Sequence, residues 1–174
     1  MTINSFQFNT TPGLRYGSGQ AKDSCNEISN KLGQSILFIT DKGLMSLGLT
    51  DQTLKELKKI SSVEIFDDVE ADPSKKTLLK AIEVGKKIKA TGVIGFGGGS
   101  SMDVAKLTAL ILGSGENLEE AWGVANAKGP RLPLVLIPTT AGTGSEVTPV
   151  SIITVGEEEK KGVSSSIILP DLAI

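Results

Sequence analysis

The stretch GVIGFGGGSSMDVAKLTALIL, from Gly92 to Leu112, decides the fold that this sequence predicts. An apolar run predicts a buried strand, three glycines follow it, and a helix with small residues on its face comes next. Glycine adopts backbone angles that other residues avoid, so consecutive glycines let backbone N–H groups approach an oxyanion closely. The first turn of the helix adds unpaired N–H groups and the positive end of its dipole. The segment therefore predicts a phosphate-binding loop at Gly97, Gly98, Gly99 and Ser100.

Polar side chains in the predicted helix are candidates for capping the helix or for contacting a phosphate in this loop. Ser100 is expected to cap the helix or to donate to phosphate, and its spacing from Asp103 matches a capping box. Lys106 is the only charged residue between Val104 and Leu112. A lysine in a buried helix needs a partner, which would be Asp103 or a ligand phosphate. A tight turn without a ligand would need fewer glycines, and the absence of a Walker A loop disfavours phosphoryl transfer.

Apolar runs of strand length alternate with helical patterns along the rest of the chain. Strands separated by helices imply βαβ units, so we predict an α/β fold with a parallel sheet. The opening segment 6–17 is expected to add an edge strand or a hairpin, and 157–161 (EEEKK) to form a hairpin tip. The predicted strands are 35–40, 63–66, 92–96, 134–137 and 150–155, and the predicted helices are 21–32, 51–60, 73–90 and 101–112.

Composition limits the classes of function. The 174 residues carry a net charge of −2, a size that suits one domain over 1–174 and a charge that disfavours a nucleic-acid surface. No apolar run is long enough to span a bilayer, so a membrane is not expected as a partner either. Cys25 is the single cysteine, which predicts no disulfide and a reducing cytoplasm. The sequence has no histidine, which excludes a hydrolytic triad and a histidine-containing zinc site.

A second group of polar residues follows the predicted strand 134–137. The segment PTTAGTGSE places the hydroxyls of Thr139, Thr140, Thr143 and Ser145 where a parallel strand ends. Ligands of open α/β sheets bind at the carboxyl ends of the strands, where these hydroxyls can bond phosphate, ribose or a nicotinamide amide. Bonds from the hydroxyls to the local backbone are the alternative. Two such loops on successive strands would converge on one crevice.

An acidic residue at a strand end is the usual ligand of a ribose. In the common dinucleotide fold it follows the glycines by about 20 residues, but the glutamates in 116–120 lie on a polar stretch. Asp41 directly follows the strand 35–40 and is the better candidate, although it precedes the glycine loop. The architecture is therefore a variant of the common one. Asp72 is expected to cap the helix that begins at Pro73.

The motifs GGGSSMDVAK and IPTTAGTGSEVTPVSIIT together resemble the iron-containing (group III) alcohol dehydrogenases. ITDKG at 39–43, Asp-Pro at Asp72, and KKGVSSSIILPDLAI at 160–174 add to the resemblance, which covers the whole chain as the N-terminal half of the family. The glycine motif alone would also suit glycerol dehydrogenase or dehydroquinate synthase, but TTAGTGSE favours the alcohol dehydrogenases. The resemblance implies a Rossmann-like parallel sheet with helices on both faces, and hydride transfer between an alcohol or aldehyde and NAD(P).

The resemblance also implies roles for the candidate residues. Gly98, Gly99 and Ser100 would hold the pyrophosphate. Asp41 would bind the adenosine ribose and favour NAD over NADP, because an acid repels a 2′-phosphate. Lys160 would contact the cofactor, or Lys161 if the register is shifted by one, and Asp72 stands where the family commonly has asparagine. The candidate cofactor-binding residues are Asp41, Asp72, Gly97, Gly98, Gly99, Ser100, Asp103, Thr139, Thr140, Thr143, Ser145 and Lys160.

The family also holds a divalent metal, usually iron, through one aspartate and three histidines of a C-terminal helical domain. The sequence has no histidine and ends in an apolar stretch, so that domain is expected to be absent, with no metal ligands and no catalytic residues here. We expect binding of NAD with little or no alcohol oxidation by this chain alone. A non-enzymatic nucleotide-binding or interaction module, and one half of a split enzyme, are the alternatives. The expected partner is a second copy, in a homodimer, or the missing C-terminal domain.

Overall fold

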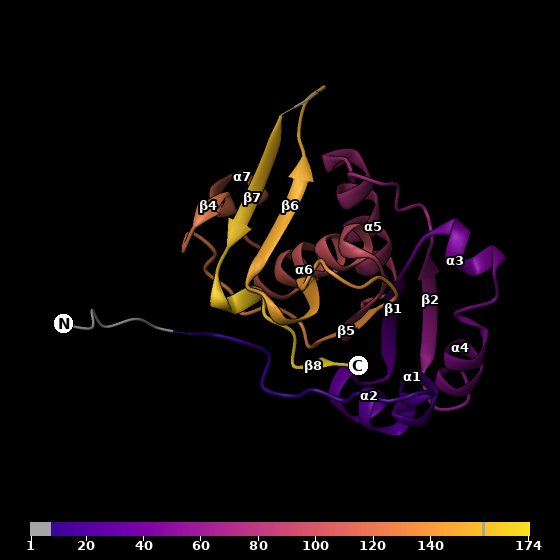
Figure 1. The fold of residues 1–174 in the computed structure, drawn as a ribbon. Coiled ribbons are helices and arrows are strands. Elements are labelled where there is room, and N and C mark those ends of the chain that lie inside the picture. The colour runs from indigo at the N-terminus through magenta and orange to yellow at the C-terminus, as the bar shows by residue number, and fades with distance from the viewer. Residues whose placement is uncertain (1–7, 158) are drawn as a thin grey trace.

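The fold is described by a computed structural model, which covers residues 8–157 and 159–174 (Figure 1). Its elements are α1 (Gln20–Asp23), α2 (Cys25–Leu32), β1 (Ser35–Ile39), α3 (Lys42–Ser46), α4 (Asp51–Leu57), β2 (Ser62–Phe66), α5 (Lys75–Lys87), β3 (Gly92–Gly97), α6 (Gly99–Ser114), α7 (Leu118–Ala121), β4 (Gly123–Val124), β5 (Leu134–Pro138), the 3-10 helix η1 (Ser145–Val147), β6 (Val150–Thr154), β7 (Lys160–Ser164), the 3-10 helix η2 (Ser166–Ile168) and β8 (Leu172–Ala173). No helix in these two ranges is both long enough and apolar enough to cross a bilayer.

A five-stranded sheet with the order β2-β1-β3-β5-β8 forms the centre of the fold. Its neighbouring strands are all parallel, as the alternation of strands and helices predicts. Successive side chains of a strand point to opposite faces, so Leu37 and Ile39 pack with α5 and α6 whereas Ile36 and Phe38 pack with α2 and α4. The Rossmann-like α/β fold with helices on both faces is therefore confirmed (Figure 1).

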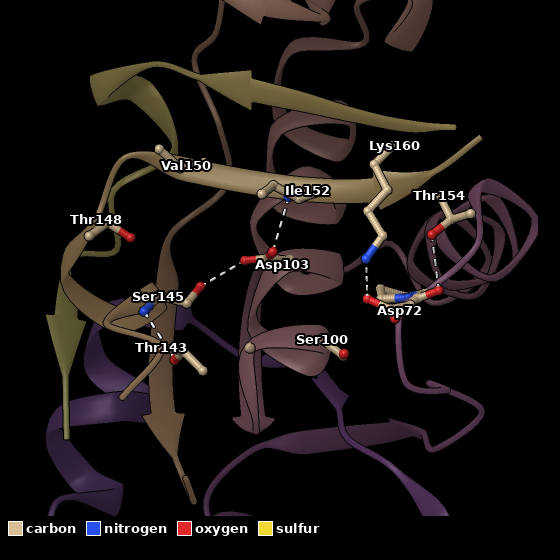
Figure 2. A pocket seen from close by; sticks show the side chains of 12 residues that line it. Asp72, Ser100, Asp103, Thr143, Ser145, Thr148, Val150, Ile152, Thr154 and Lys160 are labelled. Carbon is tan, nitrogen blue, oxygen red and sulfur yellow. Dashed lines mark hydrogen bonds and ion pairs between the residues drawn. The ribbon is translucent and has the colours of Figure 1, made fainter. Parts of the chain in front are cut away.

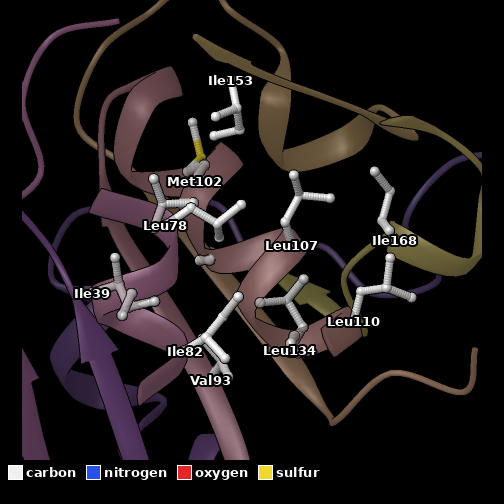
Figure 3. Close-up of a cluster of buried hydrophobic side chains, with 14 of the residues drawn as sticks. Ile39, Leu78, Ile82, Val93, Met102, Leu107, Leu110, Leu134, Ile153 and Ile168 are labelled. Carbon is white, nitrogen blue, oxygen red and sulfur yellow. The ribbon is translucent and has the colours of Figure 1, made fainter. Parts of the chain in front are cut away.

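Helix α6 is the most deeply buried helix of the described chain, and it fixes the position of the glycine loop. Met102, Leu107 and Leu110 are fully buried in the larger hydrophobic cluster (Figure 3). A helix that is apolar on all sides belongs in an interior. It lies directly against β3, because a Cβ atom on Gly95 would stand only 2.7 Å from the Cβ of Ala105. Strand β3 therefore delivers Gly97 directly to the N-terminus of α6.

A second, three-stranded sheet with the order β4-β7-β6 packs over α6. The predicted strand 150–155 forms β6 of this sheet and pairs antiparallel with β7, so its expected place in a parallel sheet is wrong. The expected hairpin is present, but Lys160 and Lys161 belong to β7 rather than to the tip. The backbone N–H of Val155 donates to the carbonyl of Glu159 at 2.8 Å and helps to close the connection.

The helix that precedes β3 begins later than the sequence predicts. Ser74, and not Asp72, is its N-cap, since the Ser74 hydroxyl accepts a hydrogen bond from the Thr77 backbone N–H at 3.2 Å. The Glu70 carboxylate accepts from the Ser74 N–H at 2.9 Å and so fixes the capping residue. Asp72 instead adopts a left-handed conformation with φ 51°. Aspartate and serine are both good N-cap residues, and Ser74, which lies two residues closer to the helix, caps it.

Two further expectations concern the first quarter of the chain. The predicted helix 21–32 is divided into α1 and α2, with Ser24 between them. In the opening segment, Leu14 forms a parallel bridge to Ala173 on the edge strand β8, and the Arg15 N–H donates to the Ala173 carbonyl at 2.8 Å. The expected pairing at a sheet edge is thus present as a single bridge, while residues 6 and 7 lie outside the described ranges.

Candidate functional site

The glycine loop leaves the N-terminus of α6 without a side-chain cap. Gly98 is the N-cap residue, and within residues 8–157 and 159–174 no side chain caps the first turn. Gly97 has φ 154°, and a Cβ atom there would lie 2.7 Å from the hydroxyl oxygen of Ser101, so glycine is required at this position. The unpaired N–H groups of a sixteen-residue helix remain available to an anion at the carboxyl edge of the sheet.

Ser100 and Asp103 do not form the expected capping box. Ser100 lies inside α6, one residue after its start, because the helix begins at Gly99. The Asp103 carboxylate faces the second sheet instead, where it accepts hydrogen bonds from the Ser145 hydroxyl at 2.7 Å and from the Ile152 backbone N–H at 3.0 Å. Asp103 therefore joins α6 to η1 and β6 (Figure 2).

Lys106 is buried completely and extends this connection. Its ammonium donates to the Ser145 hydroxyl at 2.9 Å and to the carbonyls of Thr148 at 3.0 Å and Val150 at 2.7 Å. The Asp103 carboxylate lies 3.9 Å away. The sequence predicts Asp103 or a ligand phosphate as the partner of Lys106. In the structure its partners are Asp103 and the loop that follows β5.

Burial shifts the titration of both charged groups. Loss of solvation lowers the pKa of Lys106 to about 8, against the attraction of Asp103 and Glu146. Loss of solvation also raises the pKa of Asp103, which the hydrogen bonds from Ser145 and Ile152 and the positive charge of Lys106 partly offset. Both directions follow from the burial of this pair, whose side chains are 0% and 17% exposed.

The lowered pKa of Lys106 predicts a rise in stability with pH. Between pH 8 and 10.5 the unfolded chain holds a proton on Lys106 that the folded chain has lost, so the free energy of unfolding increases with pH. Relative to a Lys106→Met variant, which lacks this titrating group, the wild type should gain about 3 kcal/mol across this window. Urea unfolding at several pH values measures the difference, and a gap that stays constant or narrows would contradict the lowered pKa.

A cavity of about 340 Å³ opens beside the N-terminus of α6, between that helix, the second sheet and the turn before α5 (Figure 2). Its rim carries an ion pair in which the Lys160 ammonium lies 2.5 Å from an Asp72 carboxylate oxygen. The sequence predicts the strand of β6, but not that its residues Val150, Ile152 and Thr154 line this cavity. The lining residues are Asp72, Pro73, Gly99, Ser100, Asp103, Thr143, Ser145, Thr148, Val150, Ile152, Thr154 and Lys160.

A second cavity, of about 530 Å³, lies on the other side of Ser100, which lines both. It occupies the point where the strand order reverses between β1 and β3, which is where open α/β sheets bind their ligands. The Asp41 carboxylate lines it and accepts a hydrogen bond from the Leu44 backbone N–H at 2.9 Å, as the N-cap of α3. The lining residues are Asp41, Lys42, Gly43, Leu44, Leu47, Val69, Glu70, Ala71, Gly98, Ser100, Ser101, Thr139 and Thr140.

The two cavities gather nearly all of the candidate residues. Asp41, Gly98, Thr139 and Thr140 line the second cavity, and the others line the first, except that Gly97 lines neither. A metal centre does not fit: in the ranges that the structure describes, no three His, Cys, Asp or Glu side chains come together as ligands. The arrangement suits an elongated anion that reaches both cavities and bends over the N-terminus of α6.

A glycine turn that leads from a parallel strand to an uncapped helix, at the switch point of the sheet, defines a Rossmann-like domain of the nucleotide-binding class. The sequence profile of the family "iron-containing alcohol dehydrogenase" matches residues 12–174. The chain belongs to the iron-containing alcohol dehydrogenase family.

Individual relatives agree with this assignment. The sulfoacetaldehyde reductase of Bilophila wadsworthia is 31% identical over 98% of this chain and 44% of its own length. The crystal structure of a 1,3-propanediol oxidoreductase superposes with a TM-score of 0.92 at 28% identity, over 98% of this chain and 45% of that one. The sulfoacetaldehyde reductase of Bifidobacterium kashiwanohense, solved in complex with NAD+, gives 0.86 at 28% identity, over 99% and 46%. The chain thus spans less than half the length of these relatives.

Proposed function

We propose that this chain is the NAD-binding portion of an iron-type alcohol dehydrogenase, which transfers hydride between an alcohol or aldehyde and NAD. The observation that carries the proposal is the uncapped N-terminus of α6, with Gly98 and Gly99 beside it and a cavity on each side of Ser100. The NAD+ complex of the relative from Bifidobacterium kashiwanohense supports the choice of cofactor.

The geometry fits a dinucleotide. The Gly98 backbone lies open, since a Cβ atom there would meet nothing closer than the Thr140 hydroxyl at 3.5 Å, and an oxyanion can approach it. Gly98, Gly99 and Ser100 would hold the pyrophosphate, and Thr139, Thr140 and Thr143 would donate from the facing loop. This list of residues rests on their position around the two cavities.

Asp41 would select NAD over NADP. Its carboxylate lines the second cavity, where it would accept hydrogen bonds from a ribose and repel a 2′-phosphate. The hydrogen bond from Leu44 holds one carboxylate oxygen in place, so the side chain is oriented before a ligand arrives. We expect NAD to bind more tightly than NADP for this reason.

When bound, NAD supplies the hydride acceptor, and the residues of this chain bind and orient it. We propose that the metal and the alcohol are held outside these 174 residues, in a C-terminal domain or a partner chain, because the sequence has no histidine. The residues present here would then oxidise alcohols slowly or not at all on their own.

A cytoplasmic location suits the single cysteine, Cys25, which is buried.

Calorimetric titration with NAD and NADH tests the proposal. The folded chain should bind both, and Gly99→Ala should weaken binding about tenfold or more, which is about 1.4 kcal/mol. The added methyl would lie 3.3 Å from the Thr143 side chain and would narrow the cavity at its anion-binding end. Gly156→Ala is the matched control, since a Cβ atom there meets nothing closer than 3.7 Å. Absence of binding at millimolar ligand by the folded protein would refute the proposal.

A further inference from the structure

The ion pair between Asp72 and Lys160 lies on the rim of the cavity beside α6. The Lys160 ammonium is 2.5 Å from a carboxylate oxygen of Asp72, and the two side chains are 51% and 75% exposed. Asp72 belongs to the turn before α5, and Lys160 is the first residue of β7 (Figure 2). The pair therefore links the two elements that flank the opening of the cavity.

Backbone contacts hold Asp72 in this position independently of the ion pair. The Asp72 carbonyl accepts a hydrogen bond from the Thr154 hydroxyl at 3.2 Å, and the Thr154 N–H donates to the Pro73 carbonyl at 2.9 Å. Thr154 lies opposite Lys160 in the β6–β7 hairpin. These backbone hydrogen bonds hold the turn next to Lys160. They place the Asp72 carboxylate near the ammonium without help from the ion pair.

The charged side chains around this cavity work against the attraction that the N-terminus of α6 exerts on an anion. Among its lining residues, Lys160 is the only cation, and Asp72 and Asp103 are acids. The Asp103 carboxylate is turned toward Ser145 and Ile152, so Asp72 is the acid that competes for Lys160. A dinucleotide phosphate that reaches this cavity meets a cation already paired with a carboxylate.

We propose that Asp72 is a negative determinant of cofactor affinity: its carboxylate occupies Lys160, and an anionic ligand must displace it. The inference rests on the proposed function, because it needs a phosphate-bearing ligand in the cavity. Binding replaces one ion pair of Lys160 by another and leaves the Asp72 carboxylate unpaired beside the ligand. The same cavity with a neutral residue at position 72 would present a free ammonium.

Asp72→Asn tests this role with little disturbance of the fold. Asparagine has the shape of aspartate and tolerates the left-handed conformation that Asp72 adopts with φ 51°. The variant should bind NAD and ADP-ribose about two- to fivefold more tightly, the range that an exposed ion pair can withhold. The gain should shrink at high salt, which screens charges on the surface.

Lys160→Gln and the double variant show whether Asp72 acts through Lys160. Lys160→Gln alone should weaken binding, and adding Asp72→Asn to it should restore little, since no ammonium remains to be released. Asp23→Asn is the matched control. It removes the same charge from another exposed lysine–aspartate pair, at 3.5 Å from Lys22, and lines neither cofactor cavity. This control should leave the affinity unchanged.

The outcomes separate this inference from the proposed function. If the wild type binds NAD and Asp72→Asn binds it equally or more weakly, Asp72 is neutral or contacts the cofactor directly, and the inference is overturned while the cofactor site stands. An equal gain in the Lys160→Gln background also overturns it. If neither the wild type nor Asp72→Asn binds, the proposed function fails. Circular dichroism and a thermal melt of each variant establish that it is folded.

Discussion

Lys106→Met is expected to lower the free energy of unfolding by about 3 kcal/mol or more at neutral pH. Methionine fills the space of the lysine side chain but donates no hydrogen bond. The variant would leave the carbonyls of Thr148 and Val150 without this donor and the Asp103 carboxylate without its nearest cation. Removing one partner from a buried polar network costs the solvation of the groups that remain.

Urea denaturation measures this loss, and Lys86→Met serves as its control. Lys86 also forms an ion pair three residues apart on a helix, with Glu83 at 3.0 Å, but both side chains are exposed. Its replacement should change the free energy of unfolding by less than about 0.5 kcal/mol. A Lys106→Met variant as stable as the wild type would show that the hydroxyl of Ser145 and the carbonyls of Thr148 and Val150 find other partners. It would also show that the ammonium does not hold this loop on α6.

Gly113→Ala should be the second severe change, with a loss of about 3 kcal/mol or more, at or beyond the upper end of the usual cost of overpacking. A Cβ atom at Gly113 would lie 2.4 Å from the backbone carbon of Arg131 and 2.4 Å from the backbone nitrogen of Leu132. The backbone there cannot retreat easily, because the Leu132 N–H donates to the carbonyl of Ala109 at 2.9 Å. The clash outweighs the gain in helix propensity that alanine brings, about 1 kcal/mol.

Gly85→Ala provides the contrast. Its Cβ atom would also lie 2.4 Å from a neighbour, but that neighbour is the terminal methyl group of Leu112, which can rotate away. We expect a change within about 1 kcal/mol, since the clash and the helix propensity of alanine partly cancel. Thermal or urea unfolding of both variants decides the matter. Equal losses of stability in the two variants would mean that a flexible side chain and a fixed backbone oppose an added methyl group equally.

Strands β1, β3 and β5 of the central sheet could be predicted from the sequence because their residues are apolar over nearly a full strand length, whereas the two-residue strand β8 is too short for a strand pattern and was not predicted. Ile36, Leu37 and Phe38 have no exposed face, so their pattern is continuous and unambiguous. The partner of β6 could not be predicted in this way. In β6 the polar Ser151 and the apolar Ile153 are buried, whereas the apolar Val150 and Ile152 are exposed, so residue type does not indicate which face is buried. The neighbour β7 has the sequence KKGVS, which carries a weak strand signal.

The glycine and threonine loops could likewise be located from residue type and spacing, but the contacts between them could not. Ser145 lies 42 residues after Asp103, and only the packing of the second sheet on α6 brings them together. Asp72 was predicted as the cap of α5, but Ser74, two residues later, takes this role, and the Glu70 carboxylate fixes its backbone N–H. The five-residue helix α3 escaped prediction because it is too short for a periodic pattern.

The contacts of Ser145 have a consequence for how this sequence can vary in evolution. Its hydroxyl donates to Asp103 and accepts from Lys106, so one atom is shared between the glycine motif and the threonine motif. A substitution at any of the three positions removes a hydrogen bond from at least one of the other two, in a part of the protein that is largely buried. Selection should therefore accept changes at these positions only in combination, and the two motifs would be inherited as a single unit although 38 residues separate Lys106 from Ser145.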